Sequence, residues 1–195
     1  MSRLYLLRHG RTEANDRWLY CGISDLPVSP AGLTELENLR SAGGYPSLEG
    51  LRVYISGLLR TEQTLETLYG SVPHEILPDL REMDFGDFEL HSYEELKDRP
   101  DYQSWLQNPR QSCPNGESAS DMERRVLRAF QSVRNEDALL VCHGGTIAVI
   151  LQHLFPDAGK SRYDWQPANG CGYALELLPD TPPRLLGSIP MASLK

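Results

Sequence analysis

The sequence predicts an α/β protein with a mostly parallel central sheet. Three short, largely apolar runs at residues 4–7, 51–56 and 138–142 have the length and composition of buried strands. The second and third runs are each followed by a segment with helical patterning, which is typical of units whose strands run parallel. The first and third runs end in a histidine followed by glycine, at the sheet edge where open α/β folds bind ligands.

Length and composition indicate one globular domain spanning residues 1–195. The chain is 40% hydrophobic and 24% charged, and no apolar run approaches the length of a membrane span. The first residues have no signal-peptide pattern. The net charge of −8 argues against nucleic acid and against an anionic membrane as partners. The four cysteines have no Cys-x-x-Cys spacing, so we expect neither a zinc site nor a redox motif, and a reducing, cytoplasmic location.

The first predicted strand leads directly into Arg8, His9 and Gly10. A cation, an imidazole and a flexible glycine therefore lie where the strand leaves the sheet, and glycine lets the backbone approach a ligand closely. A surface pair at a strand end is the alternative interpretation for Arg8 and His9. Similar features after two later strands favour a functional site.

A long loop is expected from residue 11 to residue 26. It contains Trp18, Tyr20, Cys21 and Gly22, which could line the rim of a pocket. Local packing within the loop explains these residues equally well, so their role is left open at this point.

The next elements are a helix and a strand–helix unit. Ser29 is a suitable N-cap in front of a proline, and a glycine pair at residues 43–44 ends this helix, which we expect to be structural. The strand at residues 51–56 leads into a helix that runs to Gly70, with leucines on its inner side.

Arg60 lies in or near the first turn of that helix. A helix N-terminus with an added guanidinium group is a suitable anion site, whereas a cation there opposes the helix dipole in the absence of a ligand. A solvated arginine is the alternative, and a role in anion binding is favoured.

Several carboxylates crowd the segment from residue 80 to residue 89, after a short third strand near residue 76. The composition of this segment does not single out one of them as functional, and Asp84 and Asp87 are consistent with a hydrated loop. Short helices and a turn-rich connector follow. We expect them to form an insertion, at about residues 84–116, that covers the active site.

A long helix is predicted over residues 117–134, and a second histidine motif follows it. The helix has an apolar face, and its three arginines, which are expected to form a solvated flank, are Arg124, Arg125 and Arg128. The strand at residues 138–142 then ends in His143 and Gly144 at the start of a helix, where free N–H groups favour an anion. A satisfied core histidine is the alternative, and the parallel with His9 favours function. We expect the last strand at residues 173–178.

The pattern Leu-Arg-His-Gly-x-Thr-x-x-Asn at residues 7–15 resembles the signature of the histidine phosphatase superfamily, which includes the phosphoglycerate mutases. The resemblance implies a three-layer sandwich with helices on both faces of the sheet. It also implies that His9 is the nucleophile that becomes phosphorylated, and that Arg8 and Asn15 contact the phosphoryl group.

The resemblance continues through the other motifs. It implies that Arg60 is the second phosphate-binding arginine and that His143 is the second catalytic histidine, with Gly144 beside the phosphate. It assigns the proton donor to Glu82, with Asp84 as runner-up. The substrate-binding candidates are Cys21 and Gly22, although the family often has glutamine or a similar polar residue near that place.

These features together predict a metal-independent phosphomonoesterase that acts on a small-molecule phosphate through a phosphohistidine, with no cofactor. Short stretches at residues 82–89, 114–117 and 170–171 resemble the α-ribazole phosphatases, which suggests α-ribazole 5′-phosphate as the substrate. The alternatives are a broad-specificity sugar or nucleotide phosphatase, a phosphoglycerate mutase and, least favoured, a non-catalytic phosphate-binding module. The sequence allows either a monomer or a homodimer.

Overall fold

The computed structural model describes residues 1–108, 111–179 and 181–191. Its core is a six-stranded sheet with the order β3-β2-β4-β1-β5-β6. The strands are β1 (Ser2–Arg8), β2 (Arg52–Ile55), β3 (Glu75–Ile76), β4 (Ala138–Cys142), β5 (Gly172–Leu177) and β6 (Arg184–Ile189). The pairings among β1, β2, β3 and β4 are parallel, whereas β5 and β6 pair antiparallel. The predicted α/β class and mostly parallel sheet are confirmed.

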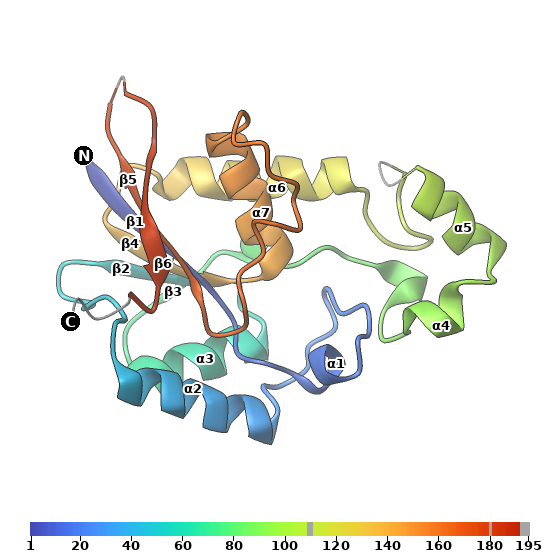
Figure 1. Cartoon of the computed structure of the whole chain (residues 1–195), viewed down its shortest axis with the longest axis horizontal. Coiled ribbons are helices and arrows are strands. Elements are labelled where there is room, and N and C mark those ends of the chain that lie inside the picture. Colours follow the sequence, from blue (N-terminus) through green and yellow to red (C-terminus); the bar gives the residue numbers. More distant parts are fainter. Residues whose placement is uncertain (109–110, 180, 192–195) are drawn as a thin grey trace.

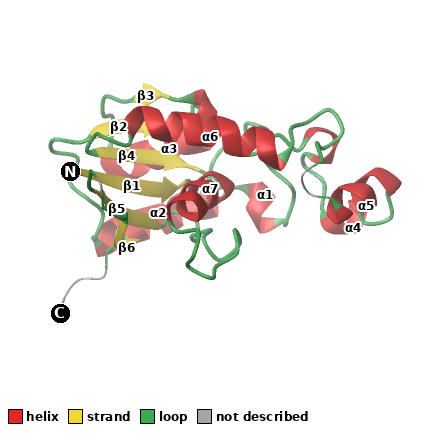
Figure 2. Ribbon diagram, turned by 90° about the horizontal axis from the view of Figure 1, so that it is seen from above, coloured by secondary structure: helices red, strands yellow, loops and turns green. Residues whose placement is uncertain are grey.

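The helices lie on both faces of this sheet, as expected (Figures 1 and 2). They are α1 (Glu13–Asp16), α2 (Pro30–Ala42), α3 (Leu59–Tyr69), α4 (Tyr93–Leu96), α5 (Pro100–Gln107), α6 (Ala119–Val133) and α7 (Gly144–Leu154), with 3-10 turns η1 (Pro78–Leu80) and η2 (Gly86–Phe88). In Figure 1, α6 and α7 cover one face of the sheet and α2 and α3 cover the other. Within the described ranges, no helix is long and apolar enough to cross a membrane.

The inner strands β1, β2, β4 and β5 divide their apolar side chains between the two faces. Leu6 packs into the core under α6 and α7 with Phe130, whereas Leu7 packs into the core under α2 and α3 with Leu36 and Leu65. This follows from the two-residue repeat of a strand. All five residues of β4 are buried because this strand is central and both of its faces are covered.

Capping residues fix where the main helices begin and end. Ser29 caps α2 as expected, and Gly70, with a φ of 78°, ends α3. The helix predicted from residue 117 begins two residues later. Ser118 is its N-cap and forms a capping box with Asp121, which satisfies the free N–H groups of the first turn.

The sequence analysis missed the final strand. It placed the last strand at residues 173–178, but β6 follows β5 and pairs with it as the sheet edge. Leu185 and Leu186 on β6 are exposed, so the strand has no inward-facing alternation that a sequence pattern could reveal. Its position therefore depends on pairing with β5. Residues 180 and 192–195 of the tail lie outside the described part of the chain.

The expected insertion contains η2, α4 and α5, which extend beyond one end of the sheet (Figure 2). An aromatic cluster holds it together: Tyr102 lies edge-on to Phe88, with ring centroids 5.3 Å apart, and close to Trp105 at 5.9 Å. Residues 109–110 of this segment lie outside the described residues.

The central strand β1 and the edge strand β6 predict different sensitivities to truncation. Replacing the fully buried Leu6 by alanine should lower the free energy of unfolding by about 2–5 kcal/mol, because it leaves a cavity between β1 and α7. Replacing Leu186, which is 47% exposed on the edge strand, should cost less than about 1 kcal/mol. Urea denaturation of both variants checks this, and equal losses would contradict the assignment of the core.

Candidate active site

Three parallel strands deliver the candidate residues to one edge of the sheet. In the register of β1, β4 and β2, Arg8 lies opposite Cys142 and Ile55 lies opposite Val141. The next residues along these strands, His9, His143 and Ser56, therefore emerge side by side. The imidazole rings of His9 and His143 have centroids 5.1 Å apart.

The ring of His9 is held in one tautomer. Its Nδ1 lies 2.7 Å from the carbonyl oxygen of Gly10, and a carbonyl only accepts hydrogen bonds, so Nδ1 carries the proton. Nε2 is then left with its lone pair. Gly10 itself is fixed by donation from its N–H to Thr64 at 2.7 Å, and a Cβ on Gly10 would collide with Leu36. The backbone that orients His9 is thus anchored on α2 and α3.

His143 is fully buried as the N-cap residue of α7. Its Nε2 lies 2.8 Å from the hydroxyl of Ser56, the first residue after β2. Its Nδ1 is buried and has no hydrogen-bond partner among the described residues. Nε2 of this imidazole is therefore held by a hydrogen bond, whereas Nδ1 is still able to form one.

Burial and neighbouring guanidinium groups hold both imidazoles neutral. Desolvation is the main cause that lowers the pKa of His9 well below its ordinary value of 6.5, followed by the positive charges of Arg60 and Arg8. The pKa of His143 is lowered for the same principal reason, with Arg60 again the leading charge. An unprotonated His9 can act as a nucleophile.

Arg60 lies in the first turn of α3 and is only 1% exposed. Its two terminal nitrogens donate to the carbonyl oxygens of Ser24 at 2.8 Å and Gly22 at 2.5 Å, and its Nε has no partner among the described residues. Over all the residues that the structure describes, no carboxylate forms an ion pair with Arg60. Burying a cation in this way is costly, which favours an anion beside it.

The loop that holds Arg60 is itself held by Glu89. The carboxylate of Glu89 accepts from the N–H groups of Gly22, Ile23 and Ser24 at 3.0–3.3 Å, and from Phe85 at 3.0 Å. The N–H and carbonyl groups of Gly22 are both used in this network, so its predicted contact with substrate stays a prediction. Sequence reasoning had no signal for the role of Glu89, because its partners on the loop are backbone groups 65 or more residues away.

Arg8 and Asn15 line a cavity on whose wall Glu82 also lies. Arg8 donates to the carbonyl of Pro167 at 2.7 Å, and its Nε has no partner within the described ranges. The side-chain oxygen of Asn15 accepts from the N–H of Thr12, completing a capping box for α1. Asn169, which the sequence analysis did not single out, donates to the carbonyl of His9 at 3.0 Å.

Glu82 and Asp84, the two candidate proton donors, occupy different environments. The carboxylate of Glu82 lines the cavity and accepts from the N–H of Gly145 at 2.8 Å, in the first turn of α7. A Cβ on Gly145 would lie 2.2 Å from that carboxylate, so a larger residue there would displace the Glu82 side chain. Asp84 instead accepts from the N–H of Gly86 within its own loop. The geometry favours Glu82. Gly144, the first residue of α7, was predicted to lie beside the phosphate, and that role stays a prediction.

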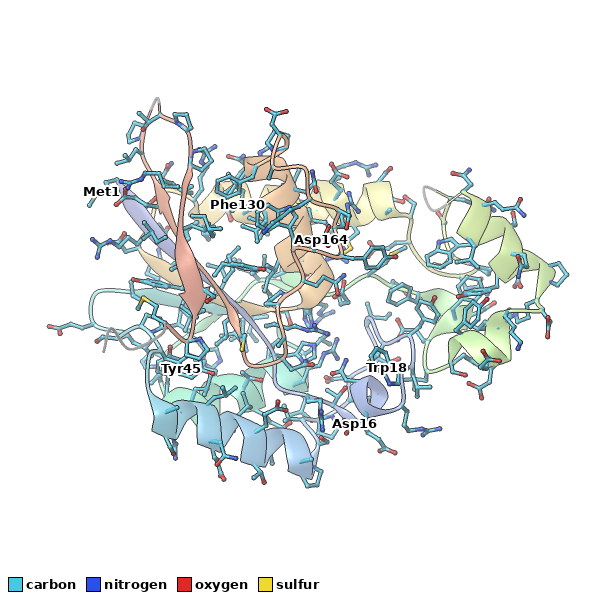
Figure 3. All side chains as sticks on the ribbon, in the orientation of Figure 1. Met1, Asp16, Trp18, Tyr45, Phe130 and Asp164 are labelled. Carbon is cyan, nitrogen blue, oxygen red and sulfur yellow. The ribbon has the colours of Figure 1, made fainter. Side chains whose placement is uncertain are left out.

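The cavity has a volume of about 570 Å³, which suits a small organic ligand. Cys21 and Tyr20 line it, together with apolar and aromatic groups from the insertion and from α6 and α7. These are Met83, Phe85, Trp105, Leu106, Met122, Ala148 and Val149. A second cavity of about 530 Å³ adjoins it, and Trp18, labelled beside α1 in Figure 3, lies there with 87% of its surface exposed.

One expectation about α6 was wrong. Arg124 and Arg128 are exposed, as predicted for a solvated flank, but the side chain of Arg125 is only 18% exposed and hydrogen-bonded to the segment that carries Glu82. The spacing of the three arginines could not reveal this difference. Among the described residues, no cluster of three or more His, Cys, Asp and Glu side chains could hold a metal ion, and the absence of a metal from the reaction stays a prediction.

Comparisons with known proteins give a consistent result. The profile of the Histidine phosphatase superfamily (branch 1) matches residues 4–185. The chain is 31% identical over 186 residues to the adenosylcobalamin/alpha-ribazole phosphatase of Salmonella typhimurium, covering 90% of each protein. It superposes on the crystal structure of the alpha-ribazole phosphatase from Shigella flexneri with a TM-score of 0.78 and 29% identity, covering 91% of each chain. A phosphoglycerate mutase from Thermus thermophilus gives a TM-score of 0.73 and 32% identity, over 95% of this chain and 97% of the other.

The two neutral histidines predict an acid-sensitive fold. In the unfolded chain each imidazole binds a proton below about pH 6.5, whereas in the folded protein its pKa is lower. Their contribution to stability is therefore complete above pH 6.5 and is lost as the pH falls, by up to about 1.4 kcal/mol per pH unit for each group. Urea unfolding at pH 7.5 and 5.5 measures this.

Replacing His143 by asparagine should reduce the pH dependence. A free energy of unfolding that stays level or rises between pH 7.5 and 5.5 would contradict the neutral assignment.

Proposed function

Since the chain belongs to the histidine phosphatase superfamily and is a phosphatase acting on a small-molecule phosphate, we propose that it hydrolyses α-ribazole 5′-phosphate through a phosphohistidine formed on His9. The observation that carries the phosphohistidine is the tautomer of His9, whose Nδ1 donates to Gly10 and whose Nε2 keeps a lone pair. That nitrogen lies in a site where Arg8 and Arg60 form no ion pair with a carboxylate among the described residues.

The first step transfers the phosphoryl group to the enzyme. Nε2 of His9 attacks phosphorus, a P–N bond forms, and the P–O bond to the alcohol breaks on the opposite side. An alkoxide leaves poorly, so Glu82 gives it a proton. The position of Glu82 on the cavity wall supports this role, and Asp84, turned into its own loop, is the weaker alternative.

The second step releases phosphate. Water attacks the phosphorus of the phosphohistidine, the carboxylate of Glu82 accepts a proton from that water, and the P–N bond breaks to restore neutral His9. The same carboxylate thus serves as acid and then as base. It is returned to its starting protonation state at the end of each cycle.

Preorganised donors stabilise the charge on the transferring group. Arg8 and Arg60 supply guanidinium N–H groups, and Asn15 supplies its side-chain amide. His143 contributes Nδ1–H when the hydroxyl of Ser56 donates to its Nε2. The N-terminal turn of α7 at Gly144 adds the positive end of a helix dipole. These groups supply the positive charge without a metal ion or cofactor.

The lining of the cavity supports a substrate with an apolar ring. Phosphate needs only polar partners, but Phe85, Trp105 and Met122 line the same space as Arg8 and Glu82. α-Ribazole 5′-phosphate joins a phosphorylated ribose to an apolar benzimidazole base, which matches both kinds of surface. The insertion that supplies Phe85 and Trp105 would then cover the bound base, as we proposed for residues 84–116.

A phosphoglycerate mutase is the second candidate, favoured by the structural likeness to the Thermus thermophilus protein. A three-carbon acid would leave the aromatic groups of the cavity without a partner, so we rank it lower. A broad sugar or nucleotide phosphatase is the remaining alternative. A cytoplasmic location, a single domain over residues 1–195 and a monomeric or homodimeric state stay predictions, as does substrate contact by Cys21.

Removing the nucleophile should abolish turnover without unfolding the protein. His9→Ala is expected to lower kcat/KM by a factor on the order of 10³ or more, because no other group replaces Nε2. Rapid quenching with ³²P-labelled substrate should trap an acid-labile, base-stable phosphoenzyme in the unchanged protein and none in His9→Ala. His91→Ala, a change on the surface, is the control. A phosphoenzyme that persists in His9→Ala would show that another residue is the nucleophile.

Substrate choice is tested by removing the base from the ester. Phosphate release, with EDTA present, should be at least about a hundredfold more efficient for α-ribazole 5′-phosphate than for ribose 5-phosphate, because burial of the apolar base adds a few kcal/mol. AMP and 3-phosphoglycerate complete the panel. A flat profile would favour the broad phosphatase, and conversion of 3-phosphoglycerate to its 2-isomer would favour the mutase.

A further inference from the structure

Three arginines of α6 differ sharply in their surroundings. The side chains of Arg124 and Arg128 are 71% and 68% exposed, and each forms a surface ion pair. Arg125 lies between them in the sequence, yet its side chain is only 18% exposed. Such a half-buried guanidinium group, outside the phosphate site, needs an explanation of its own.

All five N–H donors of Arg125 are used. Its Nε donates to Glu117 at 3.0 Å, and one N–H of its Nη2 also reaches that carboxylate. The remaining three donors reach main-chain carbonyls: Nη1 donates to Asp79 at 2.9 Å and to Arg81 at 2.7 Å, and Nη2 donates to Glu82 at 2.8 Å. A planar guanidinium group is the side chain that can make this set of contacts at once.

Glu117 extends the same network past Glu82. Its carboxylate accepts from the N–H of Asp84 at 3.0 Å while it pairs with Arg125. The main chain is therefore held on both sides of Glu82. Arg125 binds the carbonyl groups of residues 79, 81 and 82, and Glu117 binds the N–H group of residue 84. Thr146 of α7 adds a bond from its hydroxyl to the carbonyl of Leu80 at 3.0 Å.

The side chain of Glu82 has little else to fix it. Its carboxylate contacts the N–H groups of Gly145 and of its neighbour Met83, and no described side chain forms an ion pair with it. The reach of the carboxylate into the cavity therefore depends on where the main chain places its Cα atom. A proton donor acts only within hydrogen-bond distance of the leaving oxygen, so a small displacement is costly.

We propose that Arg125 is a positioning residue for Glu82: with Glu117, it holds the backbone of residues 79–84 so that the Glu82 carboxylate faces the leaving group. This inference rests on the proposed role of Glu82 as proton donor. Arg125 itself has no contact with substrate and acts only through the backbone. Loss of its contacts therefore impairs proton transfer specifically, and phosphoryl binding by Arg8 and Arg60 persists.

The test compares two esters that differ in their need for a proton donor. p-Nitrophenyl phosphate releases a stable phenolate, whereas benzyl phosphate, with a ring of the same size, releases an alkoxide.

Arg125→Lys keeps the positive charge but replaces the forked guanidinium group by a single nitrogen. It should lower kcat/KM for benzyl phosphate about tenfold more than for p-nitrophenyl phosphate. Glu82→Gln, the reference, should show the same asymmetry on the order of a hundredfold. Arg124→Lys, the matched control on the same helix, should leave both values unchanged, because Arg124 pairs only with Asp121 of that helix among the described residues.

A second variant keeps the test decisive if Arg125→Lys does not fold, as judged by circular dichroism and thermal unfolding. Glu117→Gln retains the volume and one acceptor oxygen, and it should show a smaller asymmetry of the same sign. Equal losses on both esters, or no loss, in Arg125→Lys and Glu117→Gln would overturn the positioning role if Glu82→Gln shows its asymmetry. Equal losses in Glu82→Gln would instead overturn the proton-donor role, and this inference with it.

Discussion

The parallel pairing of β1, β4 and β2 is the constraint on which the rest of the site depends. Hydrogen bonds between these buried strands fix their register, and that register brings His9, His143 and Ser56 out at one edge. Residues 87 positions apart are thereby placed within hydrogen-bond distance, as for His143 and Ser56. The helices that begin after β2 and β4 then direct their N-terminal turns toward the same place, so that strand ends and helix dipoles favour an anion together.

Electrostatics explains how this edge can attract an anion in a protein whose net charge is −8. Arg8 and Arg60 are withdrawn from water, and burial lowers the pKa of both guanidinium groups. Their positive field and the same burial keep His9 and His143 neutral. The site thus combines a cationic anion-binding surface with an unprotonated imidazole. A solvent-exposed cluster would not sustain this combination, because water would screen the charges and solvate a protonated ring.

Backbone groups hold the side chains of the site in place. Arg60 donates to carbonyl groups of a loop, and N–H groups of the same loop donate to Glu89. Glu82 lies on a segment whose carbonyl groups accept from Arg125. In both cases a charged side chain outside the phosphate site secures a stretch of main chain. Such networks are stable only when their members are satisfied, and both of these partly buried side chains use all their hydrogen-bonding groups.

The fold class and most candidate residues of the site could be predicted from the sequence alone. Apolar runs that lead into histidine and glycine are local patterns, so β1, β4 and the positions of His9 and His143 could be predicted from them. Arg60 was a candidate from its place at a helix N-terminus, and the resemblance to the histidine phosphatases added Glu82. The tertiary structure decided what depends on long-range contacts. The different surroundings of Glu82 and Asp84, and of Arg125 and Arg128, follow from partners tens of residues away. The edge strand β6 follows from pairing that leaves no apolar alternation. Burial and hydrogen-bond partners arise only when distant segments meet, and no local pattern of residues encodes them.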